Sequence, residues 1–307
     1  MRILPALAAG AVLLAGTACG AAGADGPDAG STEGLRVTAA FYPVQWAAQR
    51  VGGEHVSVHG LTKPGVEPHD LELTPRAVGE LAASDVVVYL AGFQPAVDEA
   101  VRAQAPDAGF DVSPAADLTL ATTAAGHDHA EAGAARDPHF WLDPVRLEQV
   151  ATAVGERFAT ADPAHAADYR ARAAALVGDL RALDADFRTG LAQCRSHELV
   201  TGHAAFGYLA ARYGLSQEGI AGVNPDAEPD AATLRELAAH VEQHGVTTVY
   251  SEALVDPALA QTLARETGAR VAVLDPLEGL TDGSRGRDYL EVMRSNLAVL
   301  EQGQGCS

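Results

Sequence analysis

Short apolar runs rich in β-branched residues alternate with helix-like segments along most of this chain, and this alternation limits the folds it can adopt. The runs lie at 36–41, 56–61, 86–90 and 109–112, and again at 198–202, 216–220, 247–252 and 271–274. Helix-like segments between them include 42–51, 74–83, 203–213, 231–244 and 257–267. Strands that alternate with helices form parallel sheets, because each crossover returns the chain to the same sheet edge. The sequence therefore predicts an α/β protein with two parallel-sheet domains of similar size.

Residues 145–193 separate the two series and differ from both. They are rich in alanine and leucine, and they contain a helix-start signal at Asp162 and Pro163, because aspartate caps helix N-termini and proline fits the first helical position. A helix over 163–192 would be about 45 Å long at 1.5 Å per residue. We expect a long rigid helix that joins the two domains.

The N-terminus has the pattern of an export signal. Residues 1–18 carry one arginine before an apolar stretch and end in small residues just before Cys19, and this stretch is shorter than the roughly 20 apolar residues of a transmembrane helix. A cysteine after small residues resembles a bacterial lipobox, although Gly16 stands where that pattern usually has leucine. We expect an extracytoplasmic protein anchored by lipid on Cys19. The alternative is cleavage near residues 22–24 and a secreted or periplasmic protein.

These signals give the expected organisation of the whole chain. It comprises a signal peptide at 1–18, a flexible tether at 19–34, an N-terminal α/β domain at 35–144, a linking helical region at 145–193 and a C-terminal α/β domain at 194–307.

Three cysteines are present, and two of them remain if Cys19 carries lipid. Cys194 and Cys306 can then form a disulfide in an oxidising compartment. For a loop of about 100 residues, the chain-entropy model gives a stabilisation of about 4–5 kcal/mol. The alternative is a pair of free thiols.

The charge of the chain excludes one class of partner. Among 307 residues, 41 are aspartate or glutamate and 21 are lysine or arginine, for a net charge of −20. Such a surface repels phosphate backbones, so we expect no nucleic-acid partner. It attracts cations, which is compatible with a metal site. The 48% of hydrophobic residues is enough for a packed core.

Four residues follow strands or their loops at positions suited to a metal site. His69 and His139 come from the first half, and His203 and Asp275 come from the second. Ligands of open α/β sheets collect at the carboxyl ends of the strands, so one ion between the halves can reach all four side chains. Three imidazoles and one carboxylate in a tetrahedral arrangement favour Zn²⁺. Each histidine alone is more typical of a structural or surface position, and it is the combination that indicates a metal.

Five segments resemble a known family. They read, in chain order, FYPVQWAAQRVGG, PGVEPHDLELTP, DPHFWLDP, TGHAAFGYLA and VLDPL. Their order and content are similar to the zinc-binding solute-binding proteins of ABC importers, the ZnuA/TroA group, over about residues 36–304. The resemblance implies two α/β domains bridged by a rigid helix, with the metal held between them by His69, His139, His203 and Asp275. Manganese and iron members tend to carry glutamate at the position of His203, so this chain resembles the zinc branch.

Some further residues have possible roles. His127 and His129, in a low-complexity loop within 113–136, would form an auxiliary low-affinity metal-capture arm or belong to an idle insertion. Glu252 would orient a ligand imidazole or be a solvated or capping carboxylate. The other histidines have no partner pattern and are expected at the surface or in the core: His55, His59, His165, His197, His240 and His244.

These observations predict a monomeric, non-catalytic carrier that binds Zn²⁺ outside the cytoplasm and delivers it to a membrane-embedded ABC permease. One alternative is a manganese- or iron-binding member of the same family. A zinc hydrolase is another, but a fourth protein ligand would close the open position that catalysis needs, and the sequence has neither HExxH nor GxSxG. A surface adhesin in which zinc only holds the halves together is a further alternative.

Overall fold

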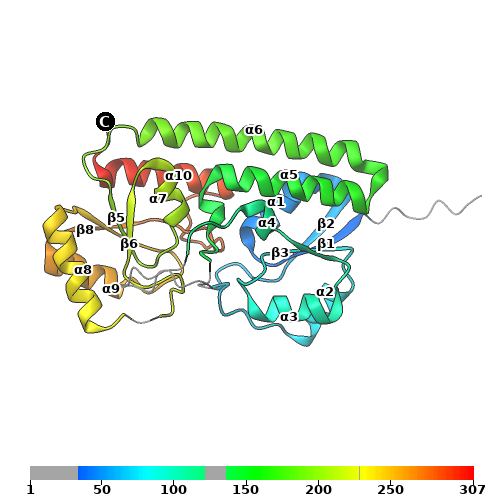
Figure 1. Ribbon diagram of the computed structural model, residues 1–307, viewed down its shortest axis with the longest axis horizontal. Helices are drawn as coiled ribbons and strands as arrows, with labels where there is room; N and C mark the ends of the chain where they lie inside the picture. The colour runs from blue at the N-terminus through cyan, green and yellow to red at the C-terminus, as the bar shows by residue number, and fades with distance from the viewer. Residues whose placement is uncertain (1–33, 122–135, 228) are drawn as a thin grey trace, which may run out of the picture. The chain divides into compact units, whose positions relative to one another are not determined.

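The computed structural model describes residues 34–121, 136–227 and 229–307 of the chain. Two sheets, each with helices on both faces, make up this part of the protein (Figure 1). Among the described residues, no helix combines the length and the apolar character that crossing a bilayer requires. Cys19, His127 and His129, for which the sequence predicts lipidation and metal capture, lie outside the described residues.

The first sheet has four parallel strands in the order β2-β1-β3-β4. Its strands are β1 (Leu35–Ala39), β2 (Val56–Gly60), β3 (Val86–Tyr89) and β4 (Gly109–Asp111), and its helices are α1 (Tyr42–Gly52), α2 (Pro75–Ala82), α3 (Pro95–Gln104) and the short α4 (Ser113–Ala116). The central strand β3 is apolar on both faces, with Val86, Val87 and Val88 fully buried, as expected for a strand covered by helices on both sides.

The second sheet repeats this topology, with the order β6-β5-β7-β8 and only parallel pairs. Its strands are β5 (Glu198–Thr201), β6 (Ser216–Gly219), β7 (Thr248–Ser251) and β8 (Arg270–Val273), and its helices are α7 (Gly207–Tyr213), α8 (Ala231–His244), α9 (Ala258–Thr267) and α10 (Tyr289–Gln304). In each sheet the strand order reverses beside the first strand, between β1 and β3 and between β5 and β7. Such switch points are where α/β sheets bind ligands. The predicted fold class of two parallel-sheet α/β units is confirmed.

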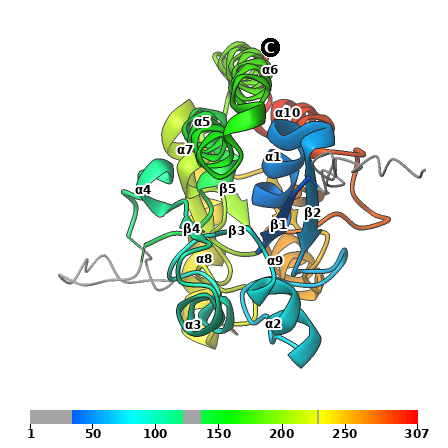
Figure 2. The ribbon, with the colours of Figure 1, turned by 90° about the vertical axis from the view of Figure 1, so that its right-hand side faces the viewer.

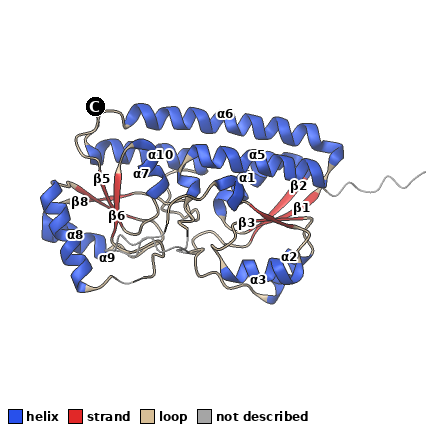
Figure 3. Cartoon of the chain, in the orientation of Figure 1, coloured by secondary structure: helices blue, strands red, loops and turns tan. Residues whose placement is uncertain are grey.

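Two long helices connect the two halves in sequence and pack against each other, α5 (Pro144–Ala161) and α6 (Ala166–Gly190). Figure 1 and Figure 2 show α1, α5, α6 and α10 along one side of the sheets, and α2, α3, α8 and α9 on the other. Figure 3 shows the same layers by secondary structure, with α6 alongside both α5 and α10. At 25 residues, α6 is about 38 Å long. Its core side chains recur every three or four residues: Leu176, Leu180, Leu183 and Phe187.

The linking helix begins later than the sequence predicts. A 3-10 turn at Pro163–His165 precedes α6, which starts at Ala166. The Asp162 side chain accepts hydrogen bonds from the His165 ring at 2.6 Å and from the Tyr169 hydroxyl at 2.8 Å. The expected cap at Asp162 is therefore replaced by side-chain hydrogen bonds, which fix the turn between α5 and α6.

The predicted disulfide is present and joins the C-terminal ends of two helices. Cys194 follows α6 and Cys306 follows α10, and the bridge spans 112 residues. It fastens the last helix of the chain to the end of α6.

Candidate metal centre

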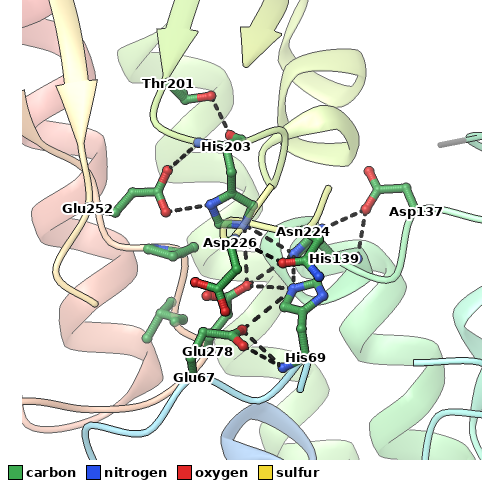
Figure 4. Close-up of polar contacts among 12 residues, drawn as sticks. Glu67, His69, Asp137, His139, Thr201, His203, Asn224, Asp226, Glu252 and Glu278 are labelled. Atoms are coloured by element: carbon green, nitrogen blue, oxygen red, sulfur yellow. Dashed lines mark hydrogen bonds and ion pairs between the residues drawn. The ribbon is translucent and has the colours of Figure 1, made fainter. Parts of the chain in front are cut away.

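Three histidines and one glutamate from the two halves converge at the carboxyl ends of the strands. His69 lies in the loop after β2, His139 lies just before α5, His203 follows β5 directly, and Glu278 lies in the loop after β8. All four side chains are buried. Figure 4 shows them pointing toward one another, and we call them the interdomain cluster.

The distances within the interdomain cluster match a tetrahedral metal site. His139 Nε2 lies 3.2 Å from His69 Nε2 and 3.4 Å from His203 Nε2. Glu278 Oε1 lies 3.1 Å from the Nε2 atoms of His69 and His139, and 3.3 Å from that of His203. Four ligands at 2.0–2.1 Å from a tetrahedral zinc would be separated by about 3.3 Å. Five of the six distances between the four ligand atoms therefore match a tetrahedral zinc site, and the sixth, between His69 and His203, is no longer than 4.8 Å.

Carboxylates outside the cluster orient two of its imidazoles. Asp137 Oδ1 accepts from His139 Nδ1 at 2.7 Å, and Glu252 Oε2 accepts from His203 Nδ1 at 2.5 Å. Because each Nδ1 carries the donated proton, each Nε2 directs a lone pair into the cluster. The Nε2 atoms of His139 and His203 and the Glu278 oxygen then face one another as acceptors at 3.1–3.4 Å, an arrangement that a shared cation or proton stabilises.

Three carboxylates also hold the backbone of the cluster histidines in place. Glu67, Asp137 and Glu252 accept hydrogen bonds from the backbone N–H groups of His69, His139 and His203, respectively, at 2.7–3.0 Å. In the N-terminal half the acceptor stands two residues before its histidine, in the tripeptides Glu-Pro-His and Asp-Pro-His. All three histidines are thus positioned from their main chain, and His139 and His203 from their rings as well.

Comparison with known proteins agrees with this geometry. The family model described as "Zinc-uptake complex component A periplasmic", ZnuA, matches residues 37–303. The chain belongs to the ZnuA family.

Individual relatives cover most of this chain. The zinc-binding protein AdcA of Streptococcus pyogenes is 35% identical over 284 residues, 87% of this chain and 55% of the relative, so the chain spans about half the length of that protein. The high-affinity zinc uptake system protein ZnuA of Bacillus subtilis is 32% identical over 92% of both chains. The solved laminin-binding protein Lmb of Streptococcus agalactiae, described as bifunctional with adhesin and metal-transporting activity, is 30% identical with a TM-score of 0.77 over 89% of this chain and all of that one.

In this member of the ZnuA family, the fourth side chain of the cluster is not the expected one. Asp275 instead accepts from Leu277 N and from the Ser284 hydroxyl, both at 2.8 Å, while its backbone exchanges two hydrogen bonds with Asn296. These bonds shape the loop after β8, and the structure brings Glu278 to the cluster in place of Asp275.

The turn that carries Glu278 into the cluster has an unusual backbone. Leu277 has a φ of 59° although it is not a glycine, and its side chain is fully buried. Non-glycine residues in the left-handed region cost about 1–3 kcal/mol and concentrate at functional sites. The Trp141 indole nitrogen donates to Pro276 O at 2.8 Å, so the His139 segment and the Glu278 loop are tied together.

The electrostatics of the interdomain cluster favour added positive charge. In the metal-free site, protons on the ring nitrogens take the place of a cation. Burial raises the pKa of Glu278, but the charge on His203 and hydrogen bonds from the protonated imidazole nitrogens outweigh it and hold that pKa well below its ordinary value. Burial lowers the pKa of His203, but Glu252 and Glu278 raise it well above 6.5. Glu278 Oε2 is also buried without a hydrogen-bond partner. The donor set and this orphaned oxygen fit a divalent cation.

The structure brings together the three histidines that the sequence singled out, and of the two roles left open for Glu252 it shows a hydrogen bond to the His203 ring. Sequence reasoning missed Glu278, Asp137 and Glu67. The acidic residue two positions before His69 and His139 was a readable signal, because a short acidic side chain can accept from a backbone N–H two residues on.

An open pocket of about 680 Å³ lies beside the Glu278 loop and is lined from both halves, by Pro64, Gly65, Ala253, Leu254, Leu280, Thr281, Asp282 and Gly283.

Proposed function

We propose that this protein is an extracytoplasmic zinc carrier, which binds Zn²⁺ through the interdomain cluster and delivers it to an ABC permease. The convergence of three imidazole Nε2 atoms and one carboxylate oxygen from both halves carries this proposal. His69, His139, His203 and Glu278 would be the ligands. Three nitrogens and one oxygen at tetrahedral spacing suit zinc, whereas manganese prefers more oxygen ligands.

A carrier fits the cluster better than an enzyme does. Catalytic zinc sites hold the metal with three protein ligands and leave one position to water or substrate. Here four buried side chains would supply all four ligands of a tetrahedral ion. A closed sphere assembled from two halves can bind cargo and release it when the halves separate. Adhesion is described for the Lmb relative, and the interdomain cluster by itself supports only the metal-binding role.

The remaining parts of the proposal rest on the sequence. Lipid on Cys19 would hold a monomeric carrier at the outer face of the cytoplasmic membrane, next to its permease. The disulfide between Cys194 and Cys306 suits an oxidising compartment outside the cytoplasm. His127 and His129 would assist capture as an auxiliary site. The domain boundaries given above stay a prediction.

Competition titration tests the metal assignment. Protein stripped with a chelator would be titrated with Zn²⁺ and with Mn²⁺ against an indicator of known affinity. We expect Zn²⁺ to bind the interdomain cluster with high affinity and Mn²⁺ to bind orders of magnitude more weakly. Displacement of Zn²⁺ by Mn²⁺ at comparable concentrations would refute the zinc assignment, and turnover of ester or peptide substrates by the zinc-loaded protein would refute the non-catalytic role.

A further inference from the structure

A second histidine–carboxylate cluster lies at the opposite end of the C-terminal sheet. It consists of Glu198, the first residue of β5, with His240 and His244 in the last turns of α8, and we call these three residues the surface cluster. His203 follows the carboxyl end of the same strand β5. The length of the strand therefore separates the surface cluster from the interdomain cluster.

Both imidazoles of the surface cluster face one carboxylate. His240 Nε2 lies 3.2 Å from Glu198 Oε2, and His244 Nδ1 lies 3.9 Å from Glu198 Oε1. The two rings stack with centroids 4.3 Å apart. Residues at i and i+4 share a helix face, and two histidines at this spacing can bind one metal ion, as they do in helical zinc motifs. The Glu198 carboxylate would supply the third ligand.

The end of α8 adds to the attraction for a cation. The helix ends at His244, and Gly245 follows in the left-handed conformation with a φ of 63°. The last-turn carbonyl groups carry the partial negative charge of the helix dipole, and Glu198 adds a carboxylate to it. Positive charge at this position is therefore favoured by the backbone as well as by the side chains.

We propose that the surface cluster is a second metal site, which binds a divalent transition ion such as Zn²⁺ or Cu²⁺ through His240, His244 and Glu198. Imidazole with carboxylate suits these ions. The site is weaker than the interdomain cluster, because it offers three protein ligands and its side chains are 24%, 42% and 22% exposed for His240, His244 and Glu198. The His244 ring must turn to bring its nitrogen within reach, and its exposure leaves room for that.

Calorimetric titration of the full chain with Zn²⁺ tests the proposal. We expect two equivalents to bind, the second much more weakly than the first. The double variant H240A/H244A loses the second equivalent and keeps the first unchanged. E198Q weakens the second by at least about tenfold, the scale of loss when a carboxylate that supports a metal site is altered. Circular dichroism establishes that each variant is folded.

A matched control separates the surface cluster from other histidines. His59→Ala removes an exposed imidazole that pairs with Glu80 at 2.9 Å in the other half, and it should retain both equivalents. The proposal is overturned if the unaltered protein binds a single equivalent up to millimolar Zn²⁺. It is also overturned if H240A/H244A keeps the second equivalent, or if H127A/H129A abolishes it. None of these outcomes depends on the proposed transport function, which concerns the first equivalent.

Discussion

The interdomain cluster and the surface cluster use the same two types of side chain but arrange their hydrogen bonds in opposite ways. In the interdomain cluster, outer carboxylates accept hydrogen bonds from the Nδ1 atoms of His139 and His203, and the Nε2 lone pairs point inward. In the surface cluster, the carboxylate faces both stacked imidazoles and accepts a hydrogen bond from one of them. The first arrangement is incomplete without added positive charge, whereas the second is satisfied as it stands.

This difference indicates that carboxylates hydrogen-bonded to the outer ring nitrogen of each imidazole contribute to the metal affinity of a histidine site. Asp137 and Glu252 fix ring orientation and tautomer in the interdomain cluster before any metal arrives. His240 and His244 have no such outer carboxylate among the described residues, and binding a metal there requires a hydrogen bond to be exchanged and a ring to turn. Preorganised ligands bind more tightly because less ordering remains to be done on binding.

The largest expected effect comes from removing one imidazole of the interdomain cluster. His203→Ala should lower zinc affinity by more than about 100-fold, beyond the 10–100-fold loss typical of altering an outer partner. Competition with a chelator of known affinity measures this, and His240→Ala is the matched control with unchanged high-affinity binding. The metal-free variant should remain folded by circular dichroism, because the two cores do not depend on zinc. Unchanged affinity in His203→Ala would show that the cluster does not hold the metal.

The next effect distinguishes the two acidic residues of the loop after β8. Glu278→Gln should weaken zinc binding by about 100-fold, the upper end of the range for altered metal-site carboxylates. Asp275→Asn should leave affinity within a few-fold but destabilise the protein by about 1–3 kcal/mol, because it disturbs a buried acceptor of two hydrogen bonds. Zinc competition and urea unfolding measure the two quantities. If Asp275→Asn were the variant that lost zinc, the fourth ligand would be misassigned.

A smaller loss is expected from the outer carboxylates. Asp137→Asn and Glu252→Gln should each lower zinc affinity by about 10–100-fold without removing a ligand. Nitrogen NMR of the imidazoles should show a shift in tautomer or protonation of His139 or His203, respectively, which a purely structural role would not produce. Glu198→Gln is the control, since it alters only the surface cluster. Wild-type zinc affinity in both variants would show that Asp137 and Glu252 do not contribute to metal binding.

A change of pH of one unit alters the site least, because every side chain stays in place. Burial lowers the pKa of His203, but Glu252 and Glu278 raise it well above 6.5, so the metal-free site favours a proton on this ring. Zinc must displace that proton, and affinity should fall by about tenfold per pH unit per displaced proton as pH decreases, beginning above pH 6.5. The contribution of His203 to the stability of the metal-free protein has the opposite trend. Because folding raises the pKa of His203, this contribution is fully present below the pKa of the unfolded state and is lost as pH rises through the pKa of the folded state.

Zinc competition and thermal unfolding across pH 5–9, with and without chelator, measure both trends. In Glu252→Gln the onset of zinc loss should move to lower pH, because a charge that raises the pKa of His203 is gone. A zinc affinity that does not vary over this range would contradict the proton competition.

The sequence predicted the positions of the strands well, because buried runs such as Val86–Val88 carry a strong local signal. The three histidines followed from the rule that ligands gather at strand ends. Glu278 did not, because the turn at Leu277 that aims it is set by the hydrogen bonds of Asp275, Ser284 and Asn296, which join residues distant in sequence. The start of α6 was misplaced for a local reason, since the Asp162 side chain bonds to the His165 ring and the Tyr169 hydroxyl instead of capping the helix.

The disulfide between Cys194 and Cys306 also determines how the protein transmits mechanical force. Tension applied between Gly34 and Ser307 would pass along the chain to Cys194 and cross directly to Cys306, so residues 195–305 would bear none of it. His203 and Glu278 lie inside this unloaded loop, whereas His69 and His139 lie on the loaded path. Under tension the C-terminal half would therefore stay closed while the N-terminal half unfolds. His203 and Glu278 would remain together, separated from His69 and His139.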